Sequence, residues 1–270
     1  MTTIGRLPDK PDYKLPLLPR LPFAVDLLLG HRRSFARDSE LVMANNPYPR
    51  RVEGLEKLPD ESTFALVMNH FDRKGLHSYH SATAVSAAVA RRRPGEPELR
   101  WAFTSEWYGR HFGPISIPVW LFRWLFRRIG LIYDFVVLPR RPELVMGRAS
   151  ALRHALSALA TAPLAITPEA AGSGRLREPP AGSGLFLASV ARRGYPLIPG
   201  AVFEEGATLV IRFGTPLALS APRELARDEQ DRLTREKVMV AIGRLLPREY
   251  WGVYESAIER SLAETPAEEE

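Results

Sequence analysis

The chain has 270 residues, of which 45% are hydrophobic and 25% charged, an ordinary composition for a soluble globular protein. It contains no cysteine, which excludes disulfides, a thiol nucleophile and thiolate metal sites. The net charge is +6, and arginine supplies most of the 37 basic residues. This charge fits a solvated surface as well as it fits an anionic membrane or a phosphorylated substrate. No helix-turn-helix, zinc-finger or RNA-binding aromatic motif is present, so we expect no nucleic-acid partner.

The start of the sequence lacks the features of an export signal. Residues 1–14 contain no apolar core of the kind that a secretory signal needs. No stretch reaches the ~18 consecutive apolar residues that a membrane-spanning helix needs. We therefore expect a cytoplasmic protein.

The two ends of the chain differ from its middle. Residues 1–22 carry five prolines and few periodic apolar positions, which predicts an extended N-terminal arm. The apolar segment 23–29 predicts one or two helical turns, which either clasp the domain or lie on a membrane. Residues 263–270 are acidic, and we expect them to form a disordered tail.

Strands and helices alternate between these ends, so residues 23–262 predict a single α/β domain in which helices flank a mixed sheet. Gly206 separates two apolar strands and predicts a hairpin. We expect a loop over 168–184, strands over 63–69, 99–104, 131–138, 164–167, 196–203 and 208–214, and helices over 76–92, 117–132, 143–160, 184–193, 223–246 and 250–262.

The predicted helix 117–132 has two contrasting faces. On a wheel of 3.6 residues per turn, one face carries Val119, Leu121, Phe122, Leu125, Phe126 and Ile129. The other face carries Trp120, Arg123, Trp124 and Arg127. Tryptophan and arginine together suit a lipid headgroup interface. A helix that packs on a core and exposes a basic side accounts for the same pattern.

Three short motifs follow one another in the predicted domain. Asn69-His70 ends an apolar strand, Thr167-Pro168-Glu169 precedes a loop of small residues, and the third motif is Gly194-Tyr195-Pro196-Leu197-Ile198-Pro199. In order and spacing they resemble the blocks N-H-x-x-x-x-D, P-E-G-T-R-S and V-P-x-x-P of the glycerolipid acyltransferases of the 1-acyl-glycerol-3-phosphate type. The resemblance covers roughly residues 66–214. It implies that family's α/β fold, an acyl thioester donor and a glycerolipid acceptor.

The chemistry of acyl transfer explains why a histidine stands at the strand end. Transfer from a thioester to an alcohol needs a base within hydrogen-bond reach of the hydroxyl. An imidazole with a pKa of ~6.5 can take that proton at neutral pH and return it to the leaving thiolate. We therefore predict that His70 is the general base. Its alternative role is structural, as a cap of the helix that follows.

The first block departs from the family pattern at its acidic position. Gly75 stands where the family has the aspartate that orients the imidazole. Asp72 and Glu169 are the candidates for a replacement acid, and His77 and His80 can contribute a hydrogen bond from the next helix. Asp72 can equally be an ordinary acid at a helix N-terminus. His77 and His80 lack an identifiable third ligand, so we expect no metal site.

The second block departs as well, because Ala170-Ala171-Gly172-Ser173 replaces Gly-Thr-Arg-Ser. The phosphate-binding arginine that the resemblance implies is thus missing. Arg175 or Arg177 can substitute from the same loop, and Ser173 and Arg140 are further candidates for binding the acceptor. Each of these arginines can also be an ordinary surface residue.

The sequence therefore predicts an O-acyltransferase on the inner face of a membrane, with acyl-CoA or acyl carrier protein as co-substrate and no other cofactor. Its expected partners are the thioester donor, a glycerolipid acceptor and an anionic membrane surface. One alternative keeps this chemistry with a different acceptor alcohol. The other is a lipid- or acyl-chain-binding protein that has lost catalysis. No serine lies in a G-x-S-x-G elbow, and no P-loop is present.

Overall fold

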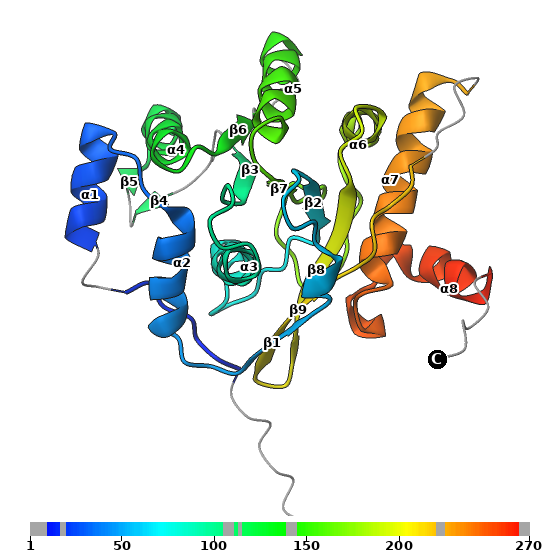
Figure 1. The fold of residues 1–270 in the computed structure, drawn as a ribbon, viewed down its shortest axis with the longest axis horizontal. Helices are drawn as coiled ribbons and strands as arrows, with labels where there is room; N and C mark the ends of the chain where they lie inside the picture. The colour runs from blue at the N-terminus through cyan, green and yellow to red at the C-terminus, as the bar shows by residue number, and fades with distance from the viewer. Residues whose placement is uncertain are drawn as a thin grey trace, which may run out of the picture.

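The structure is a computed structural model that describes residues 10–16, 20–104, 111–112, 115–138, 145–219 and 225–264. Within these residues a seven-stranded sheet has the order β1-β9-β8-β2-β7-β3-β6 (Figure 1). Neighbouring strands of this sheet are parallel except β8 and β9, which form an antiparallel hairpin. Its strands are β1 (Arg50–Glu53), β2 (Ala65–Met68), β3 (Arg100–Thr104), β6 (Val136–Leu138), β7 (Leu164–Ile166), β8 (Leu197–Glu205) and β9 (Thr208–Phe213).

Helices cover both faces of this sheet (Figure 1), which confirms the predicted fold class. One face carries α2 (Phe35–Ala44) and α3 (Ser78–Arg92), and the other carries α6 (Ser183–Arg192) and α7 (Arg227–Gly243). The remaining helices are α1 (Arg20–Leu29), α4 (Val119–Tyr133), α5 (Val145–Leu159) and α8 (Glu255–Glu264). Short elements complete the described chain: β4 (His111–Phe112) pairs with β5 (Ile115–Ser116), and the 3-10 turns are η1 (Leu55–Lys57), η2 (Arg248–Tyr250) and η3 (Gly252–Tyr254).

The strand β2 lies near the middle of the sheet and is buried along its whole length. Successive side chains of a strand point to opposite faces. Leu66 and Met68 accordingly join the core under α2 and α3, whereas Ala65 and Val67 join the core under α5 to α8. The apolar run that predicts this strand is therefore buried from both sides, as expected of a parallel sheet.

The hairpin and most of the predicted elements are confirmed. Gly206 has φ +60° in the turn between β8 and β9. The strand predicted over 131–138 is shorter, because α4 continues to Tyr133 and Asp134 then takes a left-handed conformation. The helix predicted over 250–262 starts later, because two 3-10 turns precede α8.

The elements that the sequence does not predict include α2 and β1. In α2 the hydroxyl of Ser34 accepts a hydrogen bond from the amide of Arg37 and caps the helix. β1 is an edge strand with the sequence Arg-Arg-Val-Glu, and its side chains are exposed or half-buried. Neither segment has the continuous apolar pattern that marks a buried strand or an amphipathic helix.

The N-terminal arm clasps the domain over the described residues 10–16. Tyr13 is buried, and its amide donates to the carbonyl of Gly75 at 2.7 Å. The backbone of Lys14 forms two hydrogen bonds with the side chain of Asn46. The Lys14 amide donates to the side-chain oxygen at 2.7 Å, and the Lys14 carbonyl accepts from the side-chain NH2 group at 2.8 Å. The helix α1 begins at Arg20, slightly earlier than predicted. At the other end, the acidic tail beyond residue 264 lies outside the described residues.

Candidate active site

The order of the strands brings the first two motifs together. β2 lies between β7 and β8 and is parallel to both, so the carboxyl ends of all three strands meet at one edge of the sheet. His70 follows β2, and Glu169 follows β7. Asn69 bonds to β8 through its side chain. Its side-chain NH2 group donates to the carbonyl of Val202, and its side-chain oxygen accepts from the backbone amide of Val202, both at 2.8 Å. Asn69 thereby holds the exit of β2 against β8.

Glu169, which is 6% exposed, joins the segments of the first two motifs through its carboxylate. One carboxylate oxygen accepts from the backbone amide of His70 at 2.6 Å, and the other accepts from the amide of Arg177 at 2.8 Å. Burial raises the pKa of Glu169 to about 7, although the two amide donors and the charge of Arg177 act in the opposite direction. Glu169 thus positions the backbone of His70, and the contact does not involve the imidazole.

Ser173 extends this junction as a short piece of backbone pairing. Its amide donates to the carbonyl of His70 at 2.9 Å, and its carbonyl accepts from the amide of Asp72 at 3.2 Å. The Ser173 hydroxyl bonds to the backbone of Arg175 in its own loop. Ser173 therefore holds the loop against the segment 70–72 and keeps its hydroxyl occupied locally.

Asp72 lies between three neighbours. Its carboxylate accepts from the amide of Ser78 at the start of α3 at 2.9 Å, and it lies 3.6 Å from Nδ1 of His77. A Cβ atom on Gly172 would lie 2.6 Å from the Cβ of Asp72, so only glycine leaves room for Asp72 here. In an extended segment, residues two apart share a face. Asp72 is accordingly close enough to His70 for its charge to act on the imidazole.

The imidazole of His70 is set up to be neutral. Burial lowers its pKa below the usual 6.5, and the charge of Asp72 opposes this effect only in part. Nδ1 of His70 is buried and has no hydrogen-bond partner among the described residues. A neutral ring is the state in which an imidazole can accept a proton.

Gly75 has a structural reason to be glycine. Arg73 and Leu76 form two backbone hydrogen bonds, of 2.9 and 3.0 Å, across a tight turn in which Gly75 has φ +85°. A Cβ atom at this position would lie 3.0 Å from both the Arg73 guanidinium and a carboxylate oxygen of Asp12. An aspartate here would be strained, which explains why glycine occupies this position.

A buried ion pair beside the site was missed in the sequence. Glu204 is 4% exposed at the end of β8 and holds Arg73 through both carboxylate oxygens, one of them at 2.7 Å. Arg73 also donates to the carbonyl of Pro11 at 2.8 Å, and Lys10 lies 3.5 Å from Glu204. The only hint in the sequence is an acid that directly follows an apolar strand. The pair ties the turn after His70 to β8 and to the N-terminal arm.

The remaining predicted residues lie around this centre. Arg175 and Arg177 are exposed on the loop, and Arg140 lies outside the described residues. His77 is exposed, whereas His80 is buried and its Nδ1 accepts from the amide of His77 at 3.1 Å. Burial lowers the pKa of His80 to about 4. No group of three metal-ligating side chains occurs among the described residues.

The loop that carries Glu169 is anchored where α6 begins. Asp231 of α7 accepts from the amides of Gly182 and Leu185 at 2.9 and 3.0 Å, so a carboxylate of another helix caps α6. Gly184 packs against this residue, because its Cβ would lie 2.2 Å from the carbonyl oxygen of Asp231. Both ends of the loop are thereby fixed.

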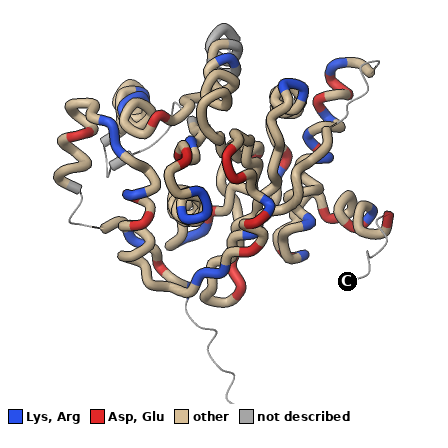
Figure 2. Tube along the Cα trace, in the orientation of Figure 1, with Lys and Arg blue, Asp and Glu red and all other residues tan. Residues whose placement is uncertain are grey.

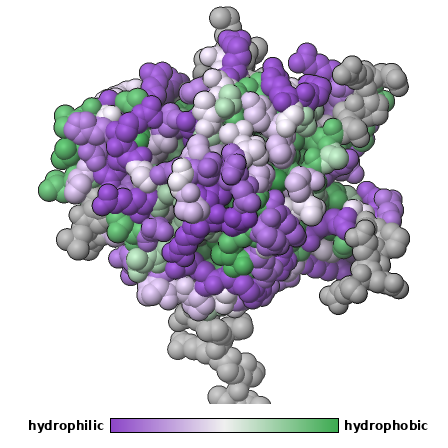
Figure 3. Space-filling view, viewed as in Figure 1, coloured by the Kyte–Doolittle hydropathy of each residue, from purple (hydrophilic) through white to green (hydrophobic). Residues whose placement is uncertain are grey.

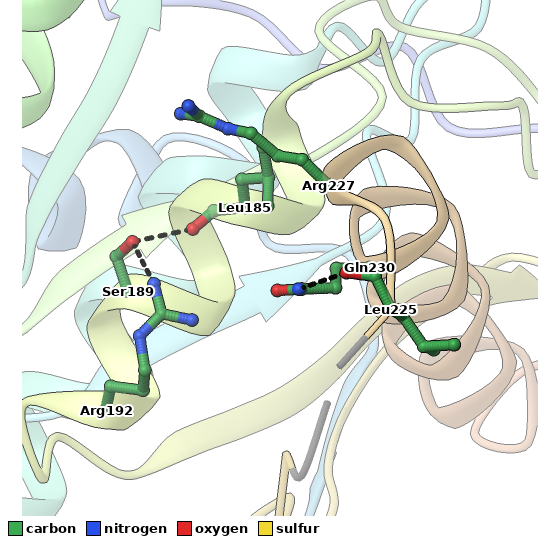
Figure 4. Close-up of a pocket in the computed structure, with 6 residues that line it drawn as sticks. All are labelled: Leu185, Ser189, Arg192, Leu225, Arg227 and Gln230. Carbon is green, nitrogen blue, oxygen red and sulfur yellow. Dashed lines mark hydrogen bonds between the residues drawn. The ribbon is translucent and has the colours of Figure 1, made fainter. Parts of the chain in front are cut away.

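A cavity of about 440 Å³ lies between α6 and the start of α7 (Figure 4). Gln230 donates to the carbonyl of Leu225 at 2.7 Å, and Arg192 donates to the hydroxyl of Ser189 at 2.9 Å. The lining residues are Leu185, Ser189, Arg192, Leu225, Arg227 and Gln230. None of them belongs to the His70 site, so this cavity plays no part in the chemistry considered below.

Exposed apolar side chains gather on α1 and α4. Figure 3 shows hydrophobic side chains at the edge of the molecule where α1 lies. Among the described residues, the exposed large apolar side chains of these two helices are Leu21, Val25, Leu28 and Leu29 of α1 and Trp120, Leu121, Trp124 and Leu131 of α4. Phe122 and Phe126 are buried as predicted, whereas Leu121 was predicted on the same face and is 38% exposed. Arg128 donates to the carbonyls of Leu27, at 2.7 Å, and Leu28 and so joins the two helices.

Along the described chain, Lys and Arg are interspersed with Asp and Glu (Figure 2). No helix among the described residues is both long enough and apolar enough to cross a membrane.

Comparison with known proteins finds a likeness in fold and none in sequence. No protein-family model matches the sequence, and no curated protein matches it. The fold is similar to the crystal structure of the 1-acyl-sn-glycerophosphate (LPA) acyltransferase PlsC from Thermotoga maritima, with a TM-score of 0.50 and 15% sequence identity. The match covers 78% of this chain and 76% of that one. The chain therefore shares the overall fold of a glycerophosphate acyltransferase.

Proposed function

We propose that this protein transfers an acyl group from a thioester to a hydroxyl of a glycerolipid, with His70 as the general base. The observation that carries the proposal is the buried imidazole at the carboxyl end of β2. Its backbone is held by Glu169, and its ring lies within the influence of Asp72. The likeness in fold to an acyltransferase supports the same class of reaction.

The reaction follows from this arrangement. The imidazole of His70 takes the proton of the acceptor hydroxyl while the hydroxyl oxygen attacks the thioester carbonyl carbon. The new C–O bond forms, the C–S bond breaks, and the proton passes from the imidazolium to the leaving thiolate. The donor is an acyl-CoA or an acyl carrier protein. The charge of Asp72 stabilises the imidazolium between these two steps.

Arg175 and Arg177 are the candidates for contact with the acceptor from the loop side. The amide of Arg175 is fixed by Ser173 at 3.0 Å, and the amide of Arg177 by Glu169 at 2.8 Å. Both side chains are exposed. A fixed backbone with a free-reaching guanidinium suits a group that contacts the outer part of a substrate.

The test is acylation of a lysolipid by the purified protein with oleoyl-CoA as donor. His70→Ala should lower kcat/KM by about 10²- to 10⁴-fold, the usual worth of a positioned general base. His31→Ala is the matched control, because His31 is exposed and pairs with Asp26 on α1. Equal turnover by the wild type and His70→Ala would remove His70 as the base.

A second candidate function is acyl-chain or lipid binding without catalysis. It is favoured by one observation: the Asp72 carboxylate caps α3 at the Ser78 amide, and no carboxylate bonds to the His70 ring among the described residues. This alternative predicts that vesicle binding survives His70→Ala and that no donor is consumed. Consumption of oleoyl-CoA that depends on His70 would exclude it.

We also propose that the apolar surface of α1 and α4 rests on an anionic membrane at the cytoplasmic face. Trp120 is 66% exposed and Trp124 39%, and aromatic rings of this kind favour the headgroup region. Arg127 is exposed on the same helix and fits anionic headgroups. Arg128 fixes α1 against α4, so the apolar surface is already formed before it meets lipid.

A further inference from the structure

The segment that follows β2 has two faces, and one of them carries the groups of the proposed acyl transfer. Residues 70–73 continue in extended form, with a parallel bridge to the neighbouring loop at Phe71. Side chains of an extended segment alternate between its faces. His70 and Asp72 therefore share one face. Phe71 and Arg73 share the other, and whatever holds this second face also sets the positions of the first.

The core holds the second face at Phe71. This residue is 3% exposed, and its ring packs edge-on against Tyr250 with 5.7 Å between the ring centroids. The hydroxyl of Tyr250 donates to the backbone carbonyl of Glu204 at 2.8 Å. Phe71 is therefore anchored beside the end of β8.

The guanidinium of Arg73 is the second anchor of this face. Its Nε donates to one carboxylate oxygen of Glu204 at 2.7 Å, and its Nη2 donates to the other. Nη2 also donates to the carbonyl of Pro11 at 2.8 Å, and Nη1 donates to that of Lys74 at 2.5 Å. The side chain of Glu204 is 1% exposed and that of Arg73 16%. A guanidinium that holds a buried carboxylate with two nitrogens is fixed in direction as well as in charge.

The strand β8 thereby holds the segment at both of its ends. Asn69 bonds to the backbone of Val202 through its side chain. Arg73 bonds to Glu204, which lies two residues further along the same strand. His70 stands between these two contacts, so a shift of its backbone along the edge of the sheet requires one of them to break.

The Asp72 carboxylate depends on this backbone for its place beside His70. No hydrogen bond joins the His70 ring to a carboxylate among the described residues. The carboxylate of Asp72 accepts from the amide of Ser78 instead, at 2.9 Å. Its charge still acts on the imidazole. Because a charge interaction weakens with distance, its strength follows the position of residue 72 and so depends on the anchor at Arg73.

We propose that Arg73 is a positioning residue of the His70 site. Through Glu204 it sets the backbone of the neighbouring Asp72, and thereby the distance between the Asp72 carboxylate and the imidazole. Arg73 lies on the face opposite to the imidazole, so it acts through Asp72 and touches neither donor nor acceptor. Its effect on the rate rests on the proposed acyl transfer, whereas its effect on the His70 ring does not.

The first test is Arg73→Lys, which keeps a cation beside Glu204 and removes the two-nitrogen contact. With oleoyl-CoA and a lysolipid as substrates, kcat should fall by roughly 10- to 100-fold, since a displacement of about 1 Å can cost that much. KM should stay within about 2-fold, because Arg73 makes no contact with substrate. An unchanged kcat, or a change in KM alone, would overturn the inference.

Arg212→Lys is the matched control for this test. Arg212 pairs with Glu53 at 2.5 Å and joins β9 to β1 on the same sheet, away from the His70 site. The kcat of this control should equal that of the wild type. An equal loss in Arg212→Lys and Arg73→Lys would show a general effect of weakening the sheet and would also overturn the inference.

The second test needs no turnover. The pKa of the His70 ring is measured by NMR titration, with its signal assigned by its loss in His70→Ala. The charge of Asp72 raises this pKa, so Arg73→Lys should lower it, as Asp72→Asn does. In Asp72→Asn/Arg73→Lys the pKa should match that of Asp72→Asn alone, because Arg73 acts through Asp72. The same shift from Arg73→Lys with and without Asp72, or no shift with it, contradicts the positioning role.

The two tests separate failure of the inference from failure of the proposed function. If the wild type transfers no acyl group, the proposed function is wrong, and the titration still decides the role of Arg73. If Arg73→Lys does not fold, Glu204→Gln takes its place in both tests, because it leaves Arg73 one acceptor oxygen in place of two. It should give the same fall in kcat and in the pKa of the His70 ring, and the absence of both would overturn the inference.

Discussion

At the scale of the residue, burial dominates the site. His70 and Glu169 are both mostly withdrawn from water, and in both the neutral form is favoured. The direction of the pKa shift is therefore opposite for the two: downward for the imidazole and upward for the carboxyl. Near neutral pH the imidazole is therefore mostly neutral, and the carboxyl that holds the backbone of His70 is close to its own midpoint.

The pKa of Glu169 predicts a pH dependence of stability. Its folded pKa of about 7 lies above the ordinary value of 4.5 for a glutamate, so the native state binds the proton more tightly than the unfolded state. The stabilising contribution of Glu169 to the free energy of unfolding is fully present below pH 4.5. It falls by up to about 3 kcal/mol as the pH rises to about 7. His70 acts in the opposite direction, since its lowered pKa costs stability as the pH falls below 6.5.

The measurement is the free energy of unfolding in urea at several pH values for the wild type and for Glu169→Gln. The free energy of unfolding of the wild type, relative to that of Glu169→Gln, should fall between pH 5 and 7.5. Only the wild type loses the contribution of the Glu169 proton. Glu178→Gln, an exposed change in the same loop, should leave the pH dependence as it is. A difference that stays constant across this range would contradict the raised pKa.

At the scale of the element, α1 and α4 form a pair that exposes apolar side chains at helical spacing. Leu21, Val25 and Leu28 follow one another at intervals of four and three, and Trp120 and Trp124 at an interval of four. The sequence predicts the contrast between the faces of α4. It does not show that α1 joins it, because the contact depends on Arg128 reaching carbonyls about a hundred residues away.

The double variant Trp120→Ala/Trp124→Ala should release the protein from vesicles of phosphatidylglycerol and phosphatidylcholine. A loss of at least ~10-fold in partitioning is expected, since each ring contributes on the order of 1 kcal/mol or more of burial in the interface. Val253→Ala/Leu262→Ala removes exposed apolar side chains elsewhere and serves as the control. Sedimentation with vesicles gives the readout. Unchanged binding would show that this surface does not meet lipid.

At the scale of the whole molecule, the α/β order and most elements could be predicted, because long apolar runs and Gly-rich turns mark them locally. α2 and β1 could not, since their exposed charged residues give no periodic apolar pattern. The motifs point to His70 and Glu169, but their contact depends on β2 lying between β7 and β8. The pair of Arg73 and Glu204 spans 131 residues, so no local pattern could reveal it.

We propose that a buried, neutral His70 accepts the proton of the acceptor, and the pH dependence of kcat/KM for acyl transfer tests this role. We expect kcat/KM to rise with an apparent pKa below 6.5 and to be level from about pH 7 upward, because burial lowers the pKa of the imidazole. In Asp72→Asn the midpoint should move further down, since the charge that opposes this shift is gone. A midpoint above 6.5 in the wild type, or an upward move in Asp72→Asn, would contradict the account.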